Sequence, residues 1–344
     1  MEKKKIYAKH YYVVPAVISL LAIIGILVFY FFTGFAKNEQ THYVYVDGDD
    51  TIDSVCAKLA PIASSHGMTA LRTLMRHSGY DEAIATGRFA INPDDGVITV
   101  FRRLKNGAQS PLMLTIPESR TIDRLAAALG KKLMLDSTTI VSALTDTAVC
   151  SQLGYSTATI PAMFVPNTYE IYWNVSVEKL LQRMKKEHDA FWNGSRQQKA
   201  MTIGLTADEV CTLASIIDEE TANTSEKPMI AGMYMNRLKA GMPLQADPTV
   251  KFALGDFAIK RIRHGMLTID SPYNTYKYEG LPPGPIKIAS IKGIDAVLDY
   301  VHHDYLYMCA KEDFSGTHNF AATYKDHLRN AARYATALNQ RGIE

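Results

Sequence analysis

The longest apolar stretch places the strongest constraint on the fold of this chain. Residues 11–35 carry no charged side chain over 25 positions. At about 1.5 Å per residue, a helix of this length crosses a hydrocarbon core of roughly 30 Å. A cleaved signal peptide is the alternative, and Gly34-Phe35-Ala36 is a weak cleavage match, but the apolar core of such a peptide is usually only about 7–15 residues long. The sequence therefore predicts an uncleaved transmembrane helix at 11–35.

The distribution of lysines predicts the orientation of this helix. Four lysines precede it, namely Lys3, Lys4, Lys5 and Lys9, and only Lys37 follows it closely. Positive side chains next to a span are enriched on the cytoplasmic side of the membrane. We therefore expect a single-pass protein with a cytoplasmic tail at residues 1–10 and with the rest of the chain outside the cytoplasm.

Charge and cysteine usage argue against several classes of protein. The chain has 37 basic and 35 acidic residues, a formal net charge of +2, and no long basic patch beyond the N-terminus, so a nucleic-acid partner is not indicated. The cysteines stand at positions 56, 150, 211 and 309 without a C-x-x-C pair. This spacing indicates neither a zinc site nor a redox motif, and it does not say whether Cys56, Cys150, Cys211 and Cys309 form disulfides. We expect no metal and no organic cofactor.

The chain beyond the anchor mixes strand and helix signals, which predicts an α+β fold. Residues 42–46 alternate apolar and polar side chains, as a half-buried strand does, and a helical pattern begins at Thr51 after a turn. Further along, residues 176–192 have the spacing of an amphipathic helix. We therefore expect a small α/β region at 40–160, followed by a mixed helical and β domain at 161–344.

A short triplet is consistent with an internal duplication inside the first region. Thr-Ile-Asp opens a helical pattern at 51–53 and again at 121–123, and Gly-Tyr follows at 79–80 and at 154–155. Threonine is a good helix N-cap, and aspartate is favourable in the first turn. Shared capping chemistry explains two such triplets as well as a duplicated strand–helix–helix module does. Both interpretations therefore stay open.

One helix in the second region has a register that can be counted. Thr206 and Glu209 match a capping box, so the helix begins there. At about 100° per residue, the following apolar residues form one stripe, made of Val210, Leu213, Ala214 and Ile217 with Ile216 at its edge. The helix ends in three acids. Glu220 lies about 60° from Ile217 on the apolar side, whereas Asp218 lies about 100° away on the other side and Glu219 about 160° away, facing water.

The inward position of Glu220 suggests acid–base chemistry. A carboxyl group packed against apolar neighbours loses hydration, which raises its pKa and lets it act as a general acid near neutral pH. Cleavage of a glycosidic bond needs such an acid. The ordinary alternative is a surface acid or an ion-pair partner at the end of an amphipathic helix, which is the commoner role for these residues.

Polar and aromatic residues after this helix favour a groove for a sugar chain. Gln245 and Asp247 lie in a polar loop, and Tyr273 and Tyr276 precede a turn rich in proline and glycine. Sugar rings offer C–H faces for stacking and hydroxyl edges for hydrogen bonds, which these side chains can meet. The tyrosines could equally belong to a half-buried strand, and Asp247 to an Asx turn before proline.

Six segments together resemble the endolytic murein transglycosylases of the YceG-like (MltG) family. In order and spacing they are LASIIDEET, MNRLKAGMPLQADPTVKFALG, YNTY, GLPPGPI, YLYM and GTHNFAATYKDH. The resemblance runs from about residue 45 to the C-terminus and includes the N-terminal anchor. The catalytic glutamate of the family directly precedes threonine in an E-x-E-T motif, which corresponds here to Glu220. Asp218 departs from the motif, because the family usually has glutamate there. Asn274 and His318 join the candidate binding residues through the motifs that contain them.

The resemblance also implies a location and partners. It implies a LysM-like, peptidoglycan-binding element within 40–160 and a catalytic domain at 161–344. It further implies a protein of the bacterial cell (inner) membrane, with its catalytic domain outside the cytoplasm. Peptidoglycan glycan strands would be its substrate, and peptidoglycan synthases are candidate partners.

The implied reaction cleaves the β-1,4 bond between N-acetylmuramic acid and N-acetylglucosamine within nascent glycan strands, which would terminate their elongation. Glu220 would protonate the leaving oxygen and then, as a carboxylate, take the proton from the C6 hydroxyl that closes onto C1 as a 1,6-anhydro end. An inverting muramidase is one alternative and would need a second carboxylate roughly 6.5–9.5 Å from Glu220, for which Asp247 is the best candidate. A noncatalytic glycan-binding membrane protein is the other.

Overall fold

The computed structural model describes residues 2–259 and 261–341, which divide into two compact units. The N-terminal unit extends to Met113 and also includes Glu170–Val175; the C-terminal unit comprises Leu114–Tyr169 and the chain from Ser176 onward. The fold is mixed α+β, as the sequence predicts. The units do not divide near 160, because residues 114–160 pack with the C-terminal unit.

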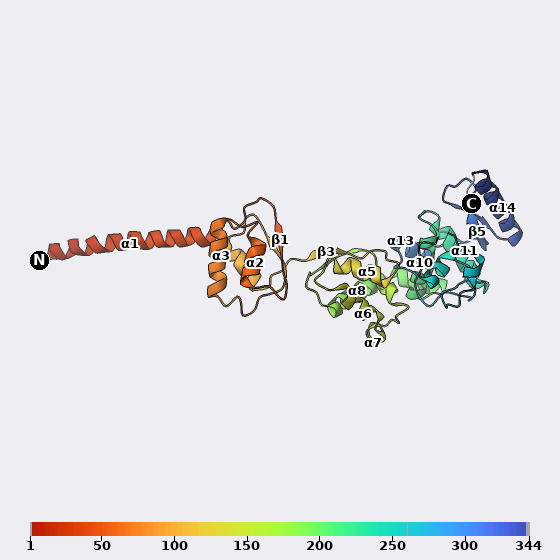
Figure 1. The fold of residues 1–344 in the computed structure, drawn as a ribbon, viewed down its shortest axis with the longest axis horizontal. Helices are drawn as coiled ribbons and strands as arrows, with labels where there is room; N and C mark the ends of the chain where they lie inside the picture. Colours follow the sequence, from red (N-terminus) through yellow and green to blue (C-terminus); the bar gives the residue numbers. More distant parts are fainter. Residues whose placement is uncertain (1, 260, 342–344) are drawn as a thin grey trace. The chain divides into compact units, whose positions relative to one another are not determined.

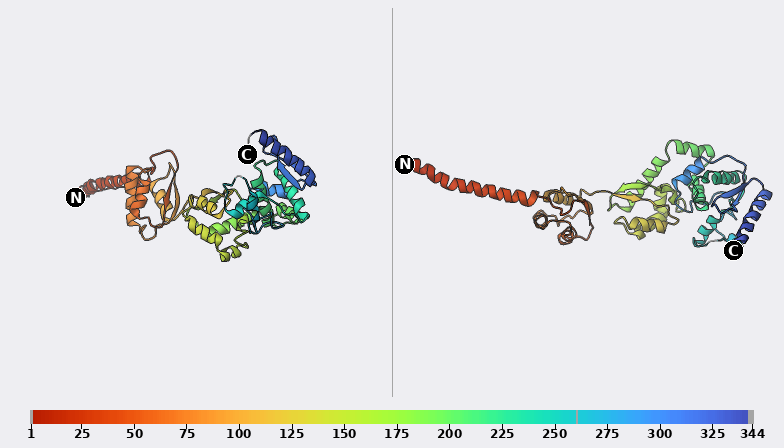
Figure 2. Two further views of the ribbon diagram at one scale, coloured as in Figure 1. Left: turned by 45° about the vertical axis from the view of Figure 1, so that its right-hand side comes forward. Right: turned by 90° about the horizontal axis from the view of Figure 1, so that it is seen from above.

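The N-terminal helix α1 (Glu2–Phe32) is uninterrupted in every view (Figure 1, Figure 2). Its segment Tyr11–Phe32 has a mean hydropathy of 2.7 and is not buried against the rest of the chain. In the described part of the chain, it is the one unbroken helix long and apolar enough to span a membrane. This fits a single-pass membrane protein.

The span ends earlier than the sequence suggests. The helix stops at Phe32, and Phe35 is fully buried in the core of the N-terminal unit. The backbone N–H of Phe35 donates to the carbonyl of Asp95 at 2.8 Å, and the N–H of Ser64 donates to the carbonyl of Phe35 at 2.8 Å. The Phe35 side chain therefore packs in a protein core and does not face lipid. A run of uncharged residues alone cannot distinguish these two environments.

The N-terminal unit has one hydrophobic core. Besides α1, a two-stranded sheet and three helices pack around this core. Its elements are β1 (His42–Val46), α2 (Ile52–Leu59), α3 (Ser65–His77), β2 (Gly87–Ile91) and α4 (Val97–Lys105). Strands β1 and β2 are antiparallel, with Val44 opposite Phe89. Both side chains are buried, so the inward face of the sheet alternates as the pattern at 42–46 predicts.

Residues 112–171 repeat the strand–helix–helix–strand order of residues 42–91, with two further short helices before the last strand. Strand β3 (Leu112–Thr115) leads to α5 (Ile122–Gly130), α6 (Ser137–Thr145), the short α7 (Thr147–Gln152), the 3-10 helix η1 (Ile160–Met163) and β4 (Thr168–Ile171), which pairs with β3. Thr51 and Thr121 each cap the first helix through their hydroxyl groups. Tyr80 and Tyr155 are both buried, each after a glycine with a positive φ.

Among its described residues, the C-terminal unit also contains α10 (Ala207–Glu220) and six further helices before its hairpin. These six are α8 (Val177–Phe191), α9 (Ser195–Ile203), α11 (Lys227–Lys239), α12 (Asp247–Leu254), the 3-10 helix η2 (His264–Thr268) and α13 (Ile291–Leu298). The chain then forms the antiparallel hairpin β5 (Tyr307–Ala310) and β6 (His318–Ala321), which packs against α14 (Tyr324–Gln340), drawn blue in Figure 1.

The central position of α10 changes the interpretation of its sequence. The Thr206 capping box is present as expected. However, α10 packs against α9, α11, α12 and α13, and all eight residues from Val210 to Ile217 are buried. Its apolar stripe therefore does not separate a buried face from a solvent face.

Candidate active site

The C-terminus of α10 opens into a cavity of about 370 Å³. The cavity is lined by residues from several elements, among them Glu220, Tyr234, Gln245, Asp247, Tyr276 and His318. Helix α10 contributes the acid, α11 the first tyrosine, the start of α12 the aspartate, and β6 the histidine. Residues far apart in the sequence thus converge on one concave site, which is the usual arrangement of a ligand-binding site.

Glu220 has surroundings suited to proton transfer. It is half-buried, and its Oε1 accepts a hydrogen bond of 2.9 Å from the Tyr234 hydroxyl. Burial raises the pKa of Glu220 from 4.5 to about 7, against the opposing effect of the Tyr234 hydrogen bond. Burial and the neighbouring Glu220 also raise the pKa of Tyr234, which keeps its hydroxyl protonated and donating. A carboxyl group with a pKa near neutrality can both give and recover a proton.

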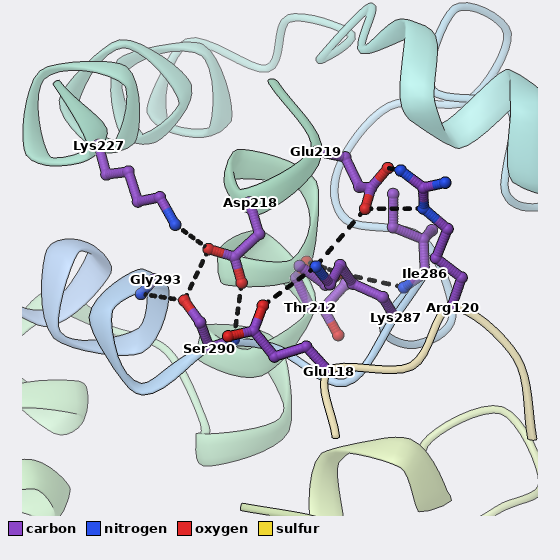
Figure 3. A network of polar contacts seen from close by, with 11 residues as sticks. Glu118, Arg120, Thr212, Asp218, Glu219, Lys227, Ile286, Lys287, Ser290 and Gly293 are labelled. Atoms are coloured by element: carbon purple, nitrogen blue, oxygen red, sulfur yellow. Dashed lines mark hydrogen bonds and ion pairs between the residues drawn. The ribbon is translucent and has the colours of Figure 1, made fainter. Parts of the chain in front are cut away.

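Glu219 does not face water, so this expectation was wrong. Its side chain is 15% exposed and lies 2.7 Å from the Arg120 guanidinium and 3.5 Å from the Lys287 ammonium (Figure 3). Lys287 also lies 3.3 Å from Glu118. These partners precede α5 and α13 and are distant in sequence, so the helical wheel could not place them.

Asp218 is buried and joins α10 to α13. Its side chain is only 1% exposed and is paired with Lys227. It also accepts hydrogen bonds from the backbone N–H of Ser290 at 2.6 Å and from the Ser290 hydroxyl at 2.8 Å (Figure 3). The Ser290 hydroxyl in turn caps α13 by accepting from the N–H of Gly293. Asp218 therefore has a structural role, although it adjoins the two glutamates in the sequence.

The fold brings four of the candidate binding residues together. Gln245, Asp247, Tyr276 and His318 line the same cavity as Glu220. The Tyr276 hydroxyl donates to Asp247 at 2.6 Å, and burial raises the pKa of Tyr276, so this hydroxyl stays protonated. Asp247 is therefore held as an acceptor beside Glu220.

Two of the candidates lie elsewhere. Tyr273 lines a separate cavity of about 230 Å³ and packs on Phe252, with 4.6 Å between ring centroids. Asn274 is fully buried, and its amide donates to the carbonyl groups of Leu267 and Ile269 at 2.9 and 2.8 Å. The YNTY segment forms a turn, so its side chains lie in different surroundings.

Sequence reasoning missed three residues that shape the site. Tyr234 is buried in α11 among apolar residues, so its spacing alone indicates burial and not a hydrogen bond to Glu220. Arg237 is 6% exposed and donates to main-chain carbonyls and to Gln245. Glu226 is 8% exposed and accepts from His318. Arg237 stands eight residues before Gln245, but no spacing rule indicates that either charged residue turns inward.

No metal centre is evident in the chain as far as it is described. Within residues 2–259 and 261–341, no three His, Cys, Asp or Glu side chains gather closely enough to hold a metal ion. The four cysteines are free thiols, and Cys56, Cys150 and Cys211 are buried.

A carboxyl group with a raised pKa, in a cavity lined by tyrosine, amide and carboxyl side chains, defines a site suited to acid–base chemistry on a polar ligand. The chain belongs to the YceG-like family, which matches it over residues 44–333. This confirms the resemblance found in the sequence motifs.

Similar proteins support this membership. The endolytic murein transglycosylase of Bacillus subtilis (strain 168) is 29% identical over 271 residues, covering 74% of this chain and 74% of its own. A protein of the same name from Streptococcus pneumoniae (strain R6) is 29% identical over 264 residues, and the match covers 67% of this chain but only 46% of the streptococcal one. A crystal structure of a yceG-like protein from Listeria monocytogenes has a TM-score of 0.55 at 24% identity, covering 85% of this chain and 99% of that chain. The fold is therefore shared.

Proposed function

We propose that this chain is an endolytic murein transglycosylase in which Glu220 is the general acid and base. The relatives from Bacillus subtilis and Streptococcus pneumoniae carry this name. The observation that carries the assignment of Glu220 is its position, because it is half-buried in the cavity and bonded to the Tyr234 hydroxyl. Asp218 and Glu219 are engaged in ion pairs with other parts of the unit.

The two proton transfers use the same carboxyl group. Protonated Glu220 donates to the glycosidic oxygen as the bond to C1 of N-acetylmuramic acid breaks and positive charge develops on that sugar. The resulting carboxylate then accepts the proton of the C6 hydroxyl, whose oxygen bonds to C1 and closes the 1,6-anhydro ring. A pKa of about 7 suits both steps, since neither protonation state is strongly disfavoured near neutral pH. The nucleophile belongs to the substrate, so no water needs activation.

An inverting muramidase is the second candidate function. The observation that favours it is a second carboxylate, Asp247, in the cavity. Asp247 lines the same cavity as Glu220 and could act as the base that activates water. The product distinguishes the two reactions, because hydrolysis leaves a reducing sugar end whereas the transglycosylase leaves an anhydro end.

The location and partners complete the proposal. The N-terminus lies in the cytoplasm of a bacterial cell and the C-terminal unit lies outside it, where nascent strands are made and where this enzyme would terminate them. Residues 40–160 include a LysM-like element that binds peptidoglycan, supported by the strand–helix–helix–strand order of residues 42–91. Peptidoglycan synthases are the proposed protein partners.

The test is digestion of purified peptidoglycan with the full-length protein in detergent, followed by mass analysis of the fragments. We expect internal cleavage and anhydro-ended products. Reducing ends would identify the hydrolase instead, and strand binding without any cleavage would identify a noncatalytic glycan-binding protein.

A further inference from the structure

Gln245 adopts a backbone conformation that is uncommon for its residue type. Its φ is +53°, in the left-handed region that favours glycine. The conformation is held by a hydrogen bond of 2.9 Å from its backbone N–H to the carbonyl of Thr275. A disfavoured conformation in the wall of the cavity that holds Glu220 suggests that the position of this side chain matters for function.

Arg237 determines which end of the Gln245 amide faces the cavity. The Arg237 Nη1 donates to the Gln245 Oε1 at 3.2 Å. A guanidinium has only donors, so the amide oxygen must face Arg237 and the amide –NH₂ must point away from it. Arg237 cannot easily turn, because it also donates to the carbonyls of Leu306 at 2.6 Å and of Pro243 at 2.9 Å. The Gln245 side chain therefore offers donors to a ligand.

Glu226 determines the tautomer of His318 in a similar way. Its carboxylate accepts from the backbone N–H of His318 at 2.6 Å and lies 2.9 Å from the Nδ1 of the same residue. A carboxylate has only acceptors, so Nδ1 carries the proton, and in the neutral ring Nε2 is an acceptor. His318 also lines the cavity. In this neutral tautomer it offers a ligand an acceptor, where Gln245 offers donors.

We propose that Gln245 and His318 recognise the acetamido group of an amino sugar in the glycan strand. The Gln245 –NH₂ donates to the acetamido carbonyl, and the His318 Nε2 accepts from the acetamido N–H. A secondary amide has one acceptor group and one N–H donor, which matches this pair. Arg237 and Glu226 are positioning residues. Arg237 keeps the Gln245 –NH₂ directed at the ligand as a donor, and Glu226 keeps the His318 Nε2 free as an acceptor. The inference rests on the proposed glycan substrate.

A sugar without its acetyl group is the discriminating probe. Its amine is protonated at neutral pH and has only donors, so it opposes the Gln245 –NH₂ instead of pairing with it. A site built to hydrogen-bond one group rejects an analogue that leaves its polar atoms unpaired. We therefore expect the acetylated strand to be cleaved with a kcat/KM at least about tenfold higher than a strand deacetylated on the recognised sugar.

The experiment compares three substrates with full-length protein in detergent: intact glycan, glycan deacetylated on N-acetylglucosamine and glycan deacetylated on N-acetylmuramic acid. Gln245→Glu keeps an oxygen toward Arg237 but replaces the donor with an acceptor, so it should reduce the acetylated-to-deacetylated ratio of kcat/KM at least about tenfold for one of the deacetylated glycans. Gln198→Glu is the matched control, because Gln198 is exposed on α9 outside the cavity, and it should keep the wild-type ratio.

Glu226→Gln tests the positioning role. An amide can face the His318 Nδ1 with either end, so the tautomer is no longer enforced. We expect KM for intact glycan to rise several-fold and the acetyl discrimination to fall, with a smaller change in kcat. A lower melting temperature with unchanged discrimination would show that Glu226 is only structural.

The outcomes separate this inference from the proposed function. If wild-type protein cleaves none of the glycans, the proposed function fails and the inference fails with it. If it cleaves both deacetylated glycans as well as intact glycan, or if Gln245→Glu retains the wild-type ratios, the acetamido assignment is overturned and the transglycosylase assignment stands.

Discussion

At the scale of single residues, Asp218, Glu219 and Glu220 show how neighbours determine the role of a carboxyl group. Asp218 is paired with Lys227, and Glu219 with Arg120, so both have cationic partners. Glu220 instead accepts from a neutral hydroxyl and has no such ion pair among the described residues. Desolvation without a compensating cation raises a carboxyl pKa, which makes Glu220 the acid able to exchange protons near pH 7.

Glu220→Gln should remove catalysis. The amide keeps the shape of the side chain but cannot donate and recover a proton, so we expect the release of anhydro-ended fragments to fall by roughly 10²–10⁴-fold with glycan binding retained. Glu219→Gln is the matched control and should retain most of the activity while lowering the melting temperature, because it weakens the ion pairs to Arg120 and Lys287. Substantial turnover by the Glu220 variant would contradict the assignment.

Glu220→Gln should also alter the pH dependence of the free energy of unfolding. The folded protein holds the Glu220 proton up to a pKa of about 7, whereas the ordinary value is 4.5. This proton therefore stabilises the fold fully below pH 4.5, and its contribution is lost as the pH rises through 7. Relative to wild type, Glu220→Gln should gain roughly 3 kcal/mol in the free energy of unfolding between pH 4 and pH 8.

Urea unfolding of both proteins at the two pH values measures this difference and cancels the titration of groups that the proteins share. A wild-type protein that gains as much stability as the variant between pH 4 and pH 8 would show that the pKa of Glu220 is not raised.

At the scale of elements, the contact between α10 and α13 depends on a glycine. A Cβ added to Gly293 would lie 2.5 Å from the Oδ1 of Asp218. That carboxylate is held by Lys227 and Ser290 and has little freedom to move. The small residue in α13 therefore lets the buried acid of α10 reach the N-terminus of the neighbouring helix.

Gly293→Ala should destabilise the protein, although alanine ordinarily favours a helix by about 1 kcal/mol over glycine. The added methyl group must displace the Asp218 carboxylate from its hydrogen bonds, and overpacking of this kind costs about 1–3 kcal/mol. Thermal unfolding measures the effect. Gly265→Ala is the control, because nothing lies within 4 Å of a Cβ at that position, and it should be nearly neutral. A stabilised Gly293→Ala protein would mean that Asp218 is free to move.

At the scale of the whole molecule, the apolar helix α1 continues into a folded unit without a separate linker. Phe35 is fully buried three residues after the end of α1. Gly34 and Ala36 form backbone bridges with Gly96 and Ala63. Removal of the chain up to Ala36 would therefore take a core side chain away from the N-terminal unit.

We accordingly expect the anchor to be retained and the C-terminal unit to lie outside the cytoplasm. A reporter that is active only in the cytoplasm should fail when fused after residue 40, and protease added to spheroplasts should degrade the C-terminal unit. N-terminal sequencing of the membrane-bound protein should find residues before Tyr11. Protection from the protease would reverse the orientation, and a mature chain beginning near Lys37 would identify a signal peptide.

Features that depend only on neighbours in the chain could be predicted from the amino-acid sequence. The uncharged run of α1, the capping box at Thr206 and the alternation of β1 are local patterns, and each produced the expected element. The motifs also identified the family, and they led to Glu220 and to four other residues of the cavity.

The pairing of buried polar groups, in contrast, becomes visible only in the folded chain. Arg120 meets Glu219 across 99 positions of the chain, and Arg237 meets the carbonyl of Leu306 across 69. A helical wheel cannot place Glu219 correctly when α10 is covered on every side, and a turn motif cannot show that the Asn274 amide is already bonded to main-chain carbonyls. Hydrophobic periodicity indicates which side chains of an element are buried. It does not indicate the partner of a buried charge, because that partner belongs to a segment distant in the sequence that packs beside it.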